Sequence, residues 1–246
     1  MSTISNVLIV LYYYLGSNFL GFWGLLSYFT YLLSYNAMKI KSPSWFVHRL
    51  MPNNYYKGVE KMHLLVSYAN STVHASVLSV IVSLYLMGLV GHVWLENAFR
   101  YSIGYLVADI IYLFDDTVNF DMSIVTTMLL LVHHLLTINY ENIIFIIDDN
   151  LVELARYVLA RSILSEIAVI PLNYAWYLIN TKQINGLKFK IISSITVITY
   201  FLSRVVNFTE LFYELYIQEL YFYLCIGIPI GILNYYWFYK LIMKQF

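Results

Sequence analysis

Long apolar runs constrain this chain more than any other feature of its sequence. A bilayer core of about 30 Å requires a helix of roughly 20 apolar residues to cross it. Runs of this kind follow one another at about residues 6–34, 64–91, 98–114, 121–140, 151–179, 187–207 and 217–241. We therefore predict an all-α integral membrane protein with about seven transmembrane helices and no room for a soluble domain.

The composition excludes several other classes of protein. Only 11% of the 246 residues are charged and 61% are hydrophobic, whereas soluble domains carry about 25% charged residues. The 14 basic and 14 acidic residues cancel, so no positive field exists to hold a nucleic acid, and we expect no such partner. The single cysteine, Cys225, excludes both a disulfide framework and a cysteine metal site.

The basic residues outside the spans gather in alternate connections between them. Because positive loops face the cytosol, this pattern predicts a lumenal or outside N-terminus and a cytosolic C-terminus. The opposite set of connections holds only Arg100, at the start of span three. The basic residues on the predicted cytosolic side are Lys39, Lys41, Arg49, Lys57, Lys61, Lys182, Lys188, Lys190, Lys240 and Lys244.

Ionisable and polar side chains also occur inside the predicted spans, where each ionisable one costs about 2.5–3.5 kcal/mol at mid-membrane. Lipid cannot satisfy such groups, so we expect them to face one another or an internal chamber. The alternative is that the hydroxyls and amides bond neighbouring helices, for about 0.6 kcal/mol each. The expected chamber-lining residues are Asn70, His74, Tyr105, Glu166, Asn173 and Arg204.

The adjacent pair His133 and His134 is the strongest indication of chemistry. Neighbouring positions on a helix point about 100° apart, so only one of the two projects squarely into the chamber. A neutral imidazole with Asp109 behind it can deprotonate a hydroxyl or amine, or attack an acyl group. His133, His134 and Asp109 are therefore the candidate catalytic residues. The chain has no HxxxH spacing and no thiol ligand, so we predict no metal site.

Several segments, taken in order, resemble the TLC-domain family, which includes the ceramide synthases. The resemblance covers about residues 50–244. It begins with Ser71-Thr-Val-His74-Ala75 and Ile103-Gly-Tyr105-Leu-Val-Ala-Asp109. The remaining matches are His133-His134-Leu-Leu-Thr137, Ser165-Glu166 with Asn173 and Trp176, Arg204, and Leu233-Asn234-Tyr-Tyr-Trp237.

The resemblance implies a barrel-like bundle of six helices, spans two to seven, around a lipid-accessible chamber. Residues 1–49 would then be an added N-terminal transmembrane helix with an interfacial linker, and residues 50–246 the TLC-like domain. In the ceramide synthase branch the histidine pair serves acyl transfer from acyl-CoA to the amine of a sphingoid base. The resemblance also implies residence in the endoplasmic reticulum.

The chain departs from the ceramide synthase pattern after the histidine pair. The stretch from Leu154 to Asn173 lacks the aspartates of that signature, the proline of span five is shifted to Pro171, and Ala175 stands where an arginine is common. The chain is therefore more similar to the other branch of the family, whose members are linked to membrane lipid composition.

Three interpretations follow. The first is a protein that binds or handles membrane lipids in a polar chamber and influences lipid composition, without established catalysis. The alternative is an acyl-CoA-dependent acyltransferase that uses His133 and His134, with acyl-CoA as a co-substrate. The third is a membrane scaffold whose buried charges only fix the bundle. We expect no resident cofactor, and the sequence names no protein partner.

Overall fold

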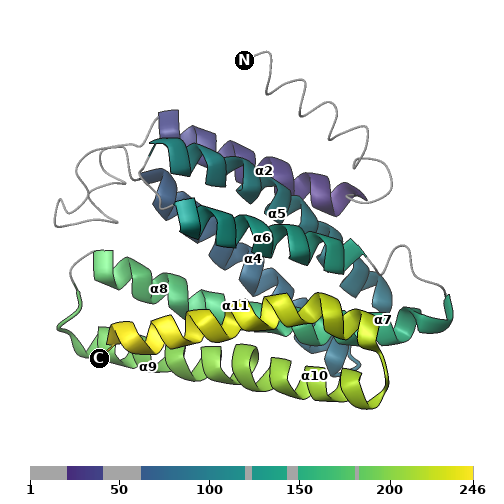
Figure 1. The fold of residues 1–246 in the computed structure, drawn as a ribbon. Helices are drawn as coiled ribbons and strands as arrows, with labels where there is room; N and C mark the ends of the chain where they lie inside the picture. The colour runs from purple at the N-terminus through teal and green to yellow at the C-terminus, as the bar shows by residue number, and fades with distance from the viewer. Residues whose placement is uncertain (1–20, 41–61, 120–123, 143–148, 181–182, 246) are drawn as a thin grey trace.

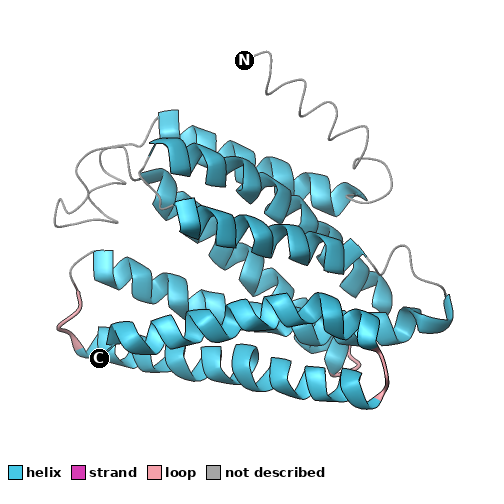
Figure 2. Cartoon of the chain, viewed as in Figure 1, coloured by secondary structure: helices cyan, strands magenta, loops and turns pink. Residues whose placement is uncertain are grey.

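The computed structural model describes residues 21–40, 62–119, 124–142, 149–180 and 183–245. These residues form helices joined by short turns, with no strand among them (Figure 2). The helices are α2 (Gly21–Ile40), α4 (Met62–Leu86), α5 (His92–Asn119), α6 (Ile124–Asn142), α7 (Asp149–Ile163), η3 (Leu164–Ala168), α8 (Val169–Asn180), α9 (Leu187–Tyr200), η4 (Phe201–Val206), α10 (Asn207–Ile217) and α11 (Tyr221–Gln245).

The bundle has two groups of helices that meet along α4. In Figure 1, α2, α5 and α6 lie in the upper part of the view, and α8, α9, α10 and α11 lie in the lower part. α4 contacts α2 and α5 of the first group and α8 of the second. It also contacts α7 and η3, which lead into α8.

Four helical segments are long and apolar enough to cross a membrane, which supports the predicted all-α membrane protein. They are Ser67–Leu86, Leu151–Ile179, Leu187–Ile217 and Tyr221–Met243. α5 is long enough, but it carries charges at Glu96, Arg100, Asp109, Asp115 and Asp116. The first part of predicted span one, residues 6–20, lies outside the described residues.

The continuous helical segment formed by α9, η4 and α10 is longer than the predicted span six. Span six was predicted to end at residue 207, yet the helix runs through η4 and α10 to Ile217. Phe208, Leu211 and Leu215 recur at helical spacing and are buried, so this stretch has an apolar face to pack. Glu210 and Glu214 interrupt the apolar run of this stretch in the sequence.

The bundle is apolar outside and partly polar inside. Large apolar side chains are exposed on several helices, for example Phe29 of α2, Val80 of α4, Ile198 of α9 and Ile232 of α11. The buried polar side chains include His74, Ser102, His134, Glu141, Asn173, Arg204 and Asn234. A soluble domain has the opposite arrangement, and lipid favours this one.

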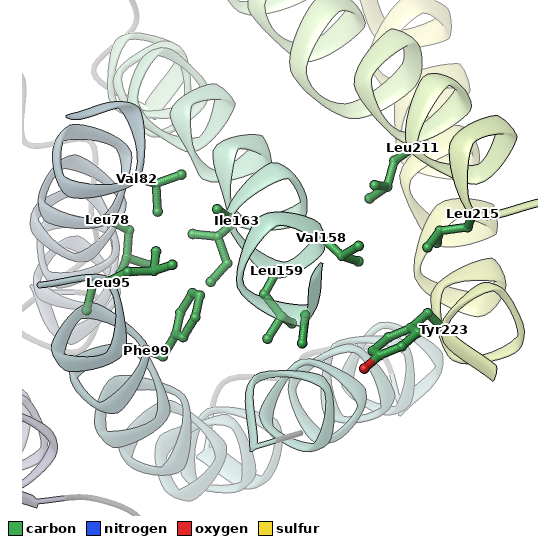
Figure 3. Close-up of a cluster of buried hydrophobic side chains, with 13 residues drawn as sticks. Leu78, Val82, Leu95, Phe99, Val158, Leu159, Ile163, Leu211, Leu215 and Tyr223 are labelled. Carbon is green, nitrogen blue, oxygen red and sulfur yellow. The ribbon is translucent and has the colours of Figure 1, made fainter. Parts of the chain in front are cut away.

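An apolar cluster packs one end of the bundle (Figure 3). Val158, Leu159 and Ile163 of α7 lie in its middle. On one side are Leu78, Val82, Leu95 and Phe99 from α4 and α5, and on the other are Leu211, Leu215 and Tyr223 from α10 and α11. The cluster therefore joins five helices near the α4–α5 and α10–α11 turns.

α2 and α5 form the most extensive contact between any two described elements. Their backbones approach at Gly24 and Gly104, where a Cβ on Gly104 would overlap the carbonyl of Gly24. Two to three helical turns further along, the contact becomes aromatic, and the rings of Tyr35 and Tyr112 stack with centroids 3.6 Å apart. Small residues that let helices approach are typical of membrane helix pairs.

Candidate functional site

A cavity of about 740 Å³ lies inside the bundle between α4, α5, α6, η3, α8, α9, η4 and α11. On α4, α5 and α11 the cavity-lining residues lie beside the apolar cluster of Figure 3, on the side away from the α4–α5 and α10–α11 turns. The cluster therefore closes one end of the cavity. Eight of the predicted site residues line it: His74, Tyr105, Asp109, His133, His134, Glu166, Asn173 and Arg204.

Asp109 of α5 and His134 of α6 form an ion pair in the cavity wall. His134 Nε2 lies 2.8 Å from Asp109 Oδ2, and His134 Nδ1 lies 2.6 Å from the carbonyl oxygen of Leu130. Both ring nitrogens of His134 therefore have a hydrogen-bond partner within the protein. The sequence-based hypothesis that Asp109 reaches one of the histidines therefore agrees with this geometry, and the partner is His134.

Tyr31 of α2 adds a third member to this pair of residues. It was not predicted from the sequence. The Tyr31 hydroxyl donates to Asp109 Oδ1 over 2.6 Å and lies 2.9 Å from Ser67 Oγ of α4. The signal was present as Tyr28, Tyr31 and Tyr35, which recur at spacings of three and four. These spacings place the three rings on one helical face, and all three are buried.

His133 is in a different state from its neighbour. Its side chain makes no hydrogen bond to the described residues, and its Nδ1 atom is buried without a partner. The edge-on ring of Trp237 from α11 lies 5.3 Å from the His133 ring, centroid to centroid. The two histidines thus differ: His134 is held by two partners, and His133 lines the cavity without a side-chain hydrogen bond to the described residues.

Arg204 joins the two irregular stretches of the long helices. Residues 201–206 wind as a π-helix, a form that is frequent at functional sites, and the facing stretch 164–168 winds as a 3-10 helix just before Pro171. Arg204 Nη2 donates to Glu166 Oε1 over 3.2 Å and Nη1 donates to Asn234 Oδ1 over 3.0 Å. Nε donates to the Ser165 carbonyl over 3.2 Å. The arginine charge is therefore satisfied within the protein.

A second polar chain runs from α4 through α5 to α6, and sequence reasoning missed its acidic member. His74 Nε2 lies 3.1 Å from Ser102 Oγ, and the Ser102 hydroxyl donates to Glu141 Oε1 over 2.8 Å. Glu141 is 1% exposed and its Oε2 atom has no partner among the described residues. Glu141 was overlooked because it lies at the expected end of span four, where a carboxylate usually meets water.

Two predicted amides serve contacts between helices. Asn70 does not line the cavity, because its Nδ2 donates to Ser34 Oγ of α2 over 2.8 Å. Asn173 does line it, yet its Nδ2 bonds to α4 at Thr72 Oγ1, 3.0 Å away, and at the Tyr68 carbonyl, 3.1 Å away. For Asn70 the alternative interpretation, a polar bond between neighbouring helices, describes the geometry better.

The far end of the cavity is aromatic and carries a cation. The rings of Tyr68 and Trp176 stack with centroids 3.9 Å apart. Phe189 and the exposed Lys240 also belong to the lining. The cavity therefore runs from an apolar closed end, past buried polar groups, to a rim where an ammonium group is exposed.

Arg156 and Arg161 of span five lie outside the cavity. Arg156 pairs with Glu96 and Glu153, and Arg161 pairs with Glu210 and Glu214. Among the described residues no group of three or more His, Cys, Asp or Glu side chains is arranged to hold a metal ion.

Comparison with known proteins adds no further assignment to this geometry. No family model matches the chain, and no curated protein and no solved structure matches it either.

Proposed function

We propose that this chain is a multi-pass membrane protein of the TLC-domain type that binds a membrane lipid in its internal cavity and thereby influences lipid composition. The observation that carries the proposal is a cavity of about 740 Å³ with His133 and His134 in its wall, inside a bundle whose outer face is apolar. Ligand cavities span about 300–1,000 Å³.

The lining favours an amphipathic ligand over a wholly polar one. Apolar side chains such as Leu106, Leu130, Leu172 and Ile230 share the wall with the buried ion pairs. The apolar side chains can accommodate a hydrocarbon chain, and the buried polar groups can accommodate a head group. A scaffold protein has no need of such a space, since its buried charges would be packed against one another.

The proposal includes seven membrane spans, with the N-terminus lumenal and the C-terminus cytosolic, in the endoplasmic reticulum. Lys188 and Lys190 begin α9 and Lys240 lies near the end of α11. Antiparallel helices bring these positions to the same end of the bundle, away from the apolar cluster. Positive residues at one end support a cytosolic location for that end, so the rim at Lys240 faces the cytosol.

A second candidate function is acyl transfer, and the state of His133 favours it. An imidazole with free nitrogens beside a lipid cavity can take the proton of an acceptor hydroxyl or amine. The acyl group then passes from the thioester of acyl-CoA to the acceptor, and the proton leaves with the CoA thiol. His134 cannot take this role while Leu130 and Asp109 occupy both of its nitrogens.

Lipid retention tests the first function. The full chain is purified in mild detergent, and the lipids that remain bound are extracted and quantified by mass spectrometry. Thr137→Phe places a ring in the cavity, and Val132→Phe places the same ring on the exposed face of the same helix. We expect the original chain and Val132→Phe to retain lipid and Thr137→Phe to lose it. Equal retention in all three would contradict binding in the cavity.

Labelled acyl-CoA tests the second function. Membranes with the original chain, with His133→Ala, and with His133→Ala/His134→Ala are compared at matched expression for labelled lipid products. Acyl transfer predicts a product that both variants lose. Equal incorporation in the variants, the original chain and empty membranes would contradict transfer from the donors tested, and lipid binding would remain the function.

A further inference from the structure

The polar groups of the cavity form two rows along α5 and α6. One row is the Asp109–His134 ion pair, and the other is the Ser102–Glu141 hydrogen bond. On each helix the two positions are seven residues apart, which is two turns, so both rows lie on the same helical faces. A rise of 1.5 Å per residue separates the rows by about 10 Å along the helices. The Glu141 row lies nearer to the closed end.

Glu141 differs from the other acidic side chains of the cavity because it has no basic partner among the described residues. Asp109 is paired with His134, and Glu166 with Arg204. Glu141 accepts one hydrogen bond, from the neutral hydroxyl of Ser102, and its other oxygen is buried without a partner among the described residues. An unsatisfied buried oxygen is unfavourable, so a ligand that supplies a donor here gains affinity.

The number of free acceptors decides which donor fits. An ammonium group brings three N–H donors, and a hydroxyl brings one. The acidic end of the His74–Ser102–Glu141 chain leaves one oxygen atom, Oε2, without a hydrogen-bond partner among the described residues. A single hydroxyl satisfies it and leaves no donor of its own unpaired, whereas an ammonium would leave N–H groups unsatisfied in an apolar surrounding.

We propose that Glu141 is the anchor of a second polar subsite, which binds a hydroxyl group on the hydrocarbon chain of the bound lipid. This inference rests on the proposed lipid-binding function and names the class of lipid. The head group faces His133, beside the first row, and the chain extends toward the closed end past Tyr105. An extended chain advances about 1.2 Å per bond, so the hydroxyl lies about nine bonds from the head group.

Three fatty acids of equal chain length test the proposal. Binding of octadecanoic, 2-hydroxyoctadecanoic and 10-hydroxyoctadecanoic acid to the full chain in nanodiscs is measured by displacement of a fluorescent fatty acid. We expect the 10-hydroxy acid to bind about tenfold more tightly than the other two, which is the upper end of the usual net contribution of one hydrogen bond. This comparison needs no variant.

Glu141→Met then removes the acceptor while keeping the shape of the side chain. We expect this variant to bind all three acids with the affinity that the original chain has for octadecanoic acid. Glu153→Gln, at an exposed carboxylate outside the cavity, should keep the tenfold preference. If Glu141→Met does not fold, the comparison of the three acids on the original chain still decides the matter.

The outcomes separate the two proposals. Binding of all three acids without preference, or a preference that survives in Glu141→Met, would overturn the subsite and leave lipid binding intact. Failure of all three acids to bind would contradict the proposed function itself, and the subsite with it.

Discussion

Tyr31 shows how a single hydroxyl connects the N-terminal helix to the interior of the bundle. Its hydrogen bond to Asp109 reaches across from α2, and Asp109 in turn holds the ring of His134. The carboxylate thus has a donor on each oxygen. Removing either donor leaves a buried charge less well satisfied, which is costly in a medium without water.

We predict that Tyr31→Phe destabilises the protein by about 1.5–3 kcal/mol, the usual range for a hydrogen bond to a charged group. The measurement is the thermal unfolding midpoint in detergent. For a chain of this size it should fall by roughly 2–4 °C for each kcal/mol lost. Tyr213→Phe is the control, since Tyr213 is exposed on α10. Equal midpoints for the two variants would show that the bond to Asp109 contributes nothing.

The individual site residues were only partly predictable. Helical spacing placed His74, Asp109 and Glu166 on inward faces, because a face depends only on positions within one helix. Spacing does not say which helix lies opposite, so the pairing of Asp109 with His134 and of Arg204 with Glu166 had to come from the fold. Glu141 was missed because it lies at the expected end of span four, and its partner Ser102 belongs to another helix.

At the scale of helices, the close approach of α2 and α5 positions Tyr31. Gly24 and Gly104 bring the two backbones together, one to two turns from Tyr31 and Asp109. Any side chain at residue 104 would push α2 outward. A displaced α2 would also withdraw the Tyr31 hydroxyl from Asp109.

We therefore predict that Gly104→Ala destabilises the protein by about 1–3 kcal/mol, as overpacking usually does. Gly91→Ala is the matched control, because a Cβ there meets no atom within 4 Å. Combining Gly104→Ala with Tyr31→Phe should lower the unfolding midpoint by less than the sum of the two single effects, since both act on the same contact. Additive effects would mean that α2 holds Tyr31 in place by other contacts.

The helices themselves were largely predictable, and their irregular stretches were not. Apolar runs of about 20 residues predicted elements near the observed α4, α6, α8 and α11. Nothing in the run around Arg204 distinguishes a π-helix from an α-helix. That stretch contacts η3, and the hydrogen bonds of Arg204 to η3 and α11 supply tertiary interactions that outweigh local preference.

For the whole molecule, the proposed orientation in the membrane rests on where the basic residues lie. We predict that a cysteine at residue 185, in the connection before α9, faces the cytosol, and that one at residue 89, in the connection after α4, faces the lumen. Cys225 is exposed, so it is first replaced by alanine. Asn185→Cys should then react with a membrane-impermeant maleimide in sealed microsomes, and Leu89→Cys only after the membrane is opened. The reverse result would invert the topology.

We propose above all that the interior of the bundle holds a lipid. The most direct measurement is photocrosslinking of a fatty acid that carries a diazirine in its chain, followed by peptide mapping of the labelled residues. The account predicts label on cavity-lining residues such as Leu106 and Leu172, which excess unlabelled fatty acid prevents and Thr137→Phe abolishes. Label confined to lipid-facing residues such as Val80 and Ile198, unaffected by competitor or variant, would contradict it.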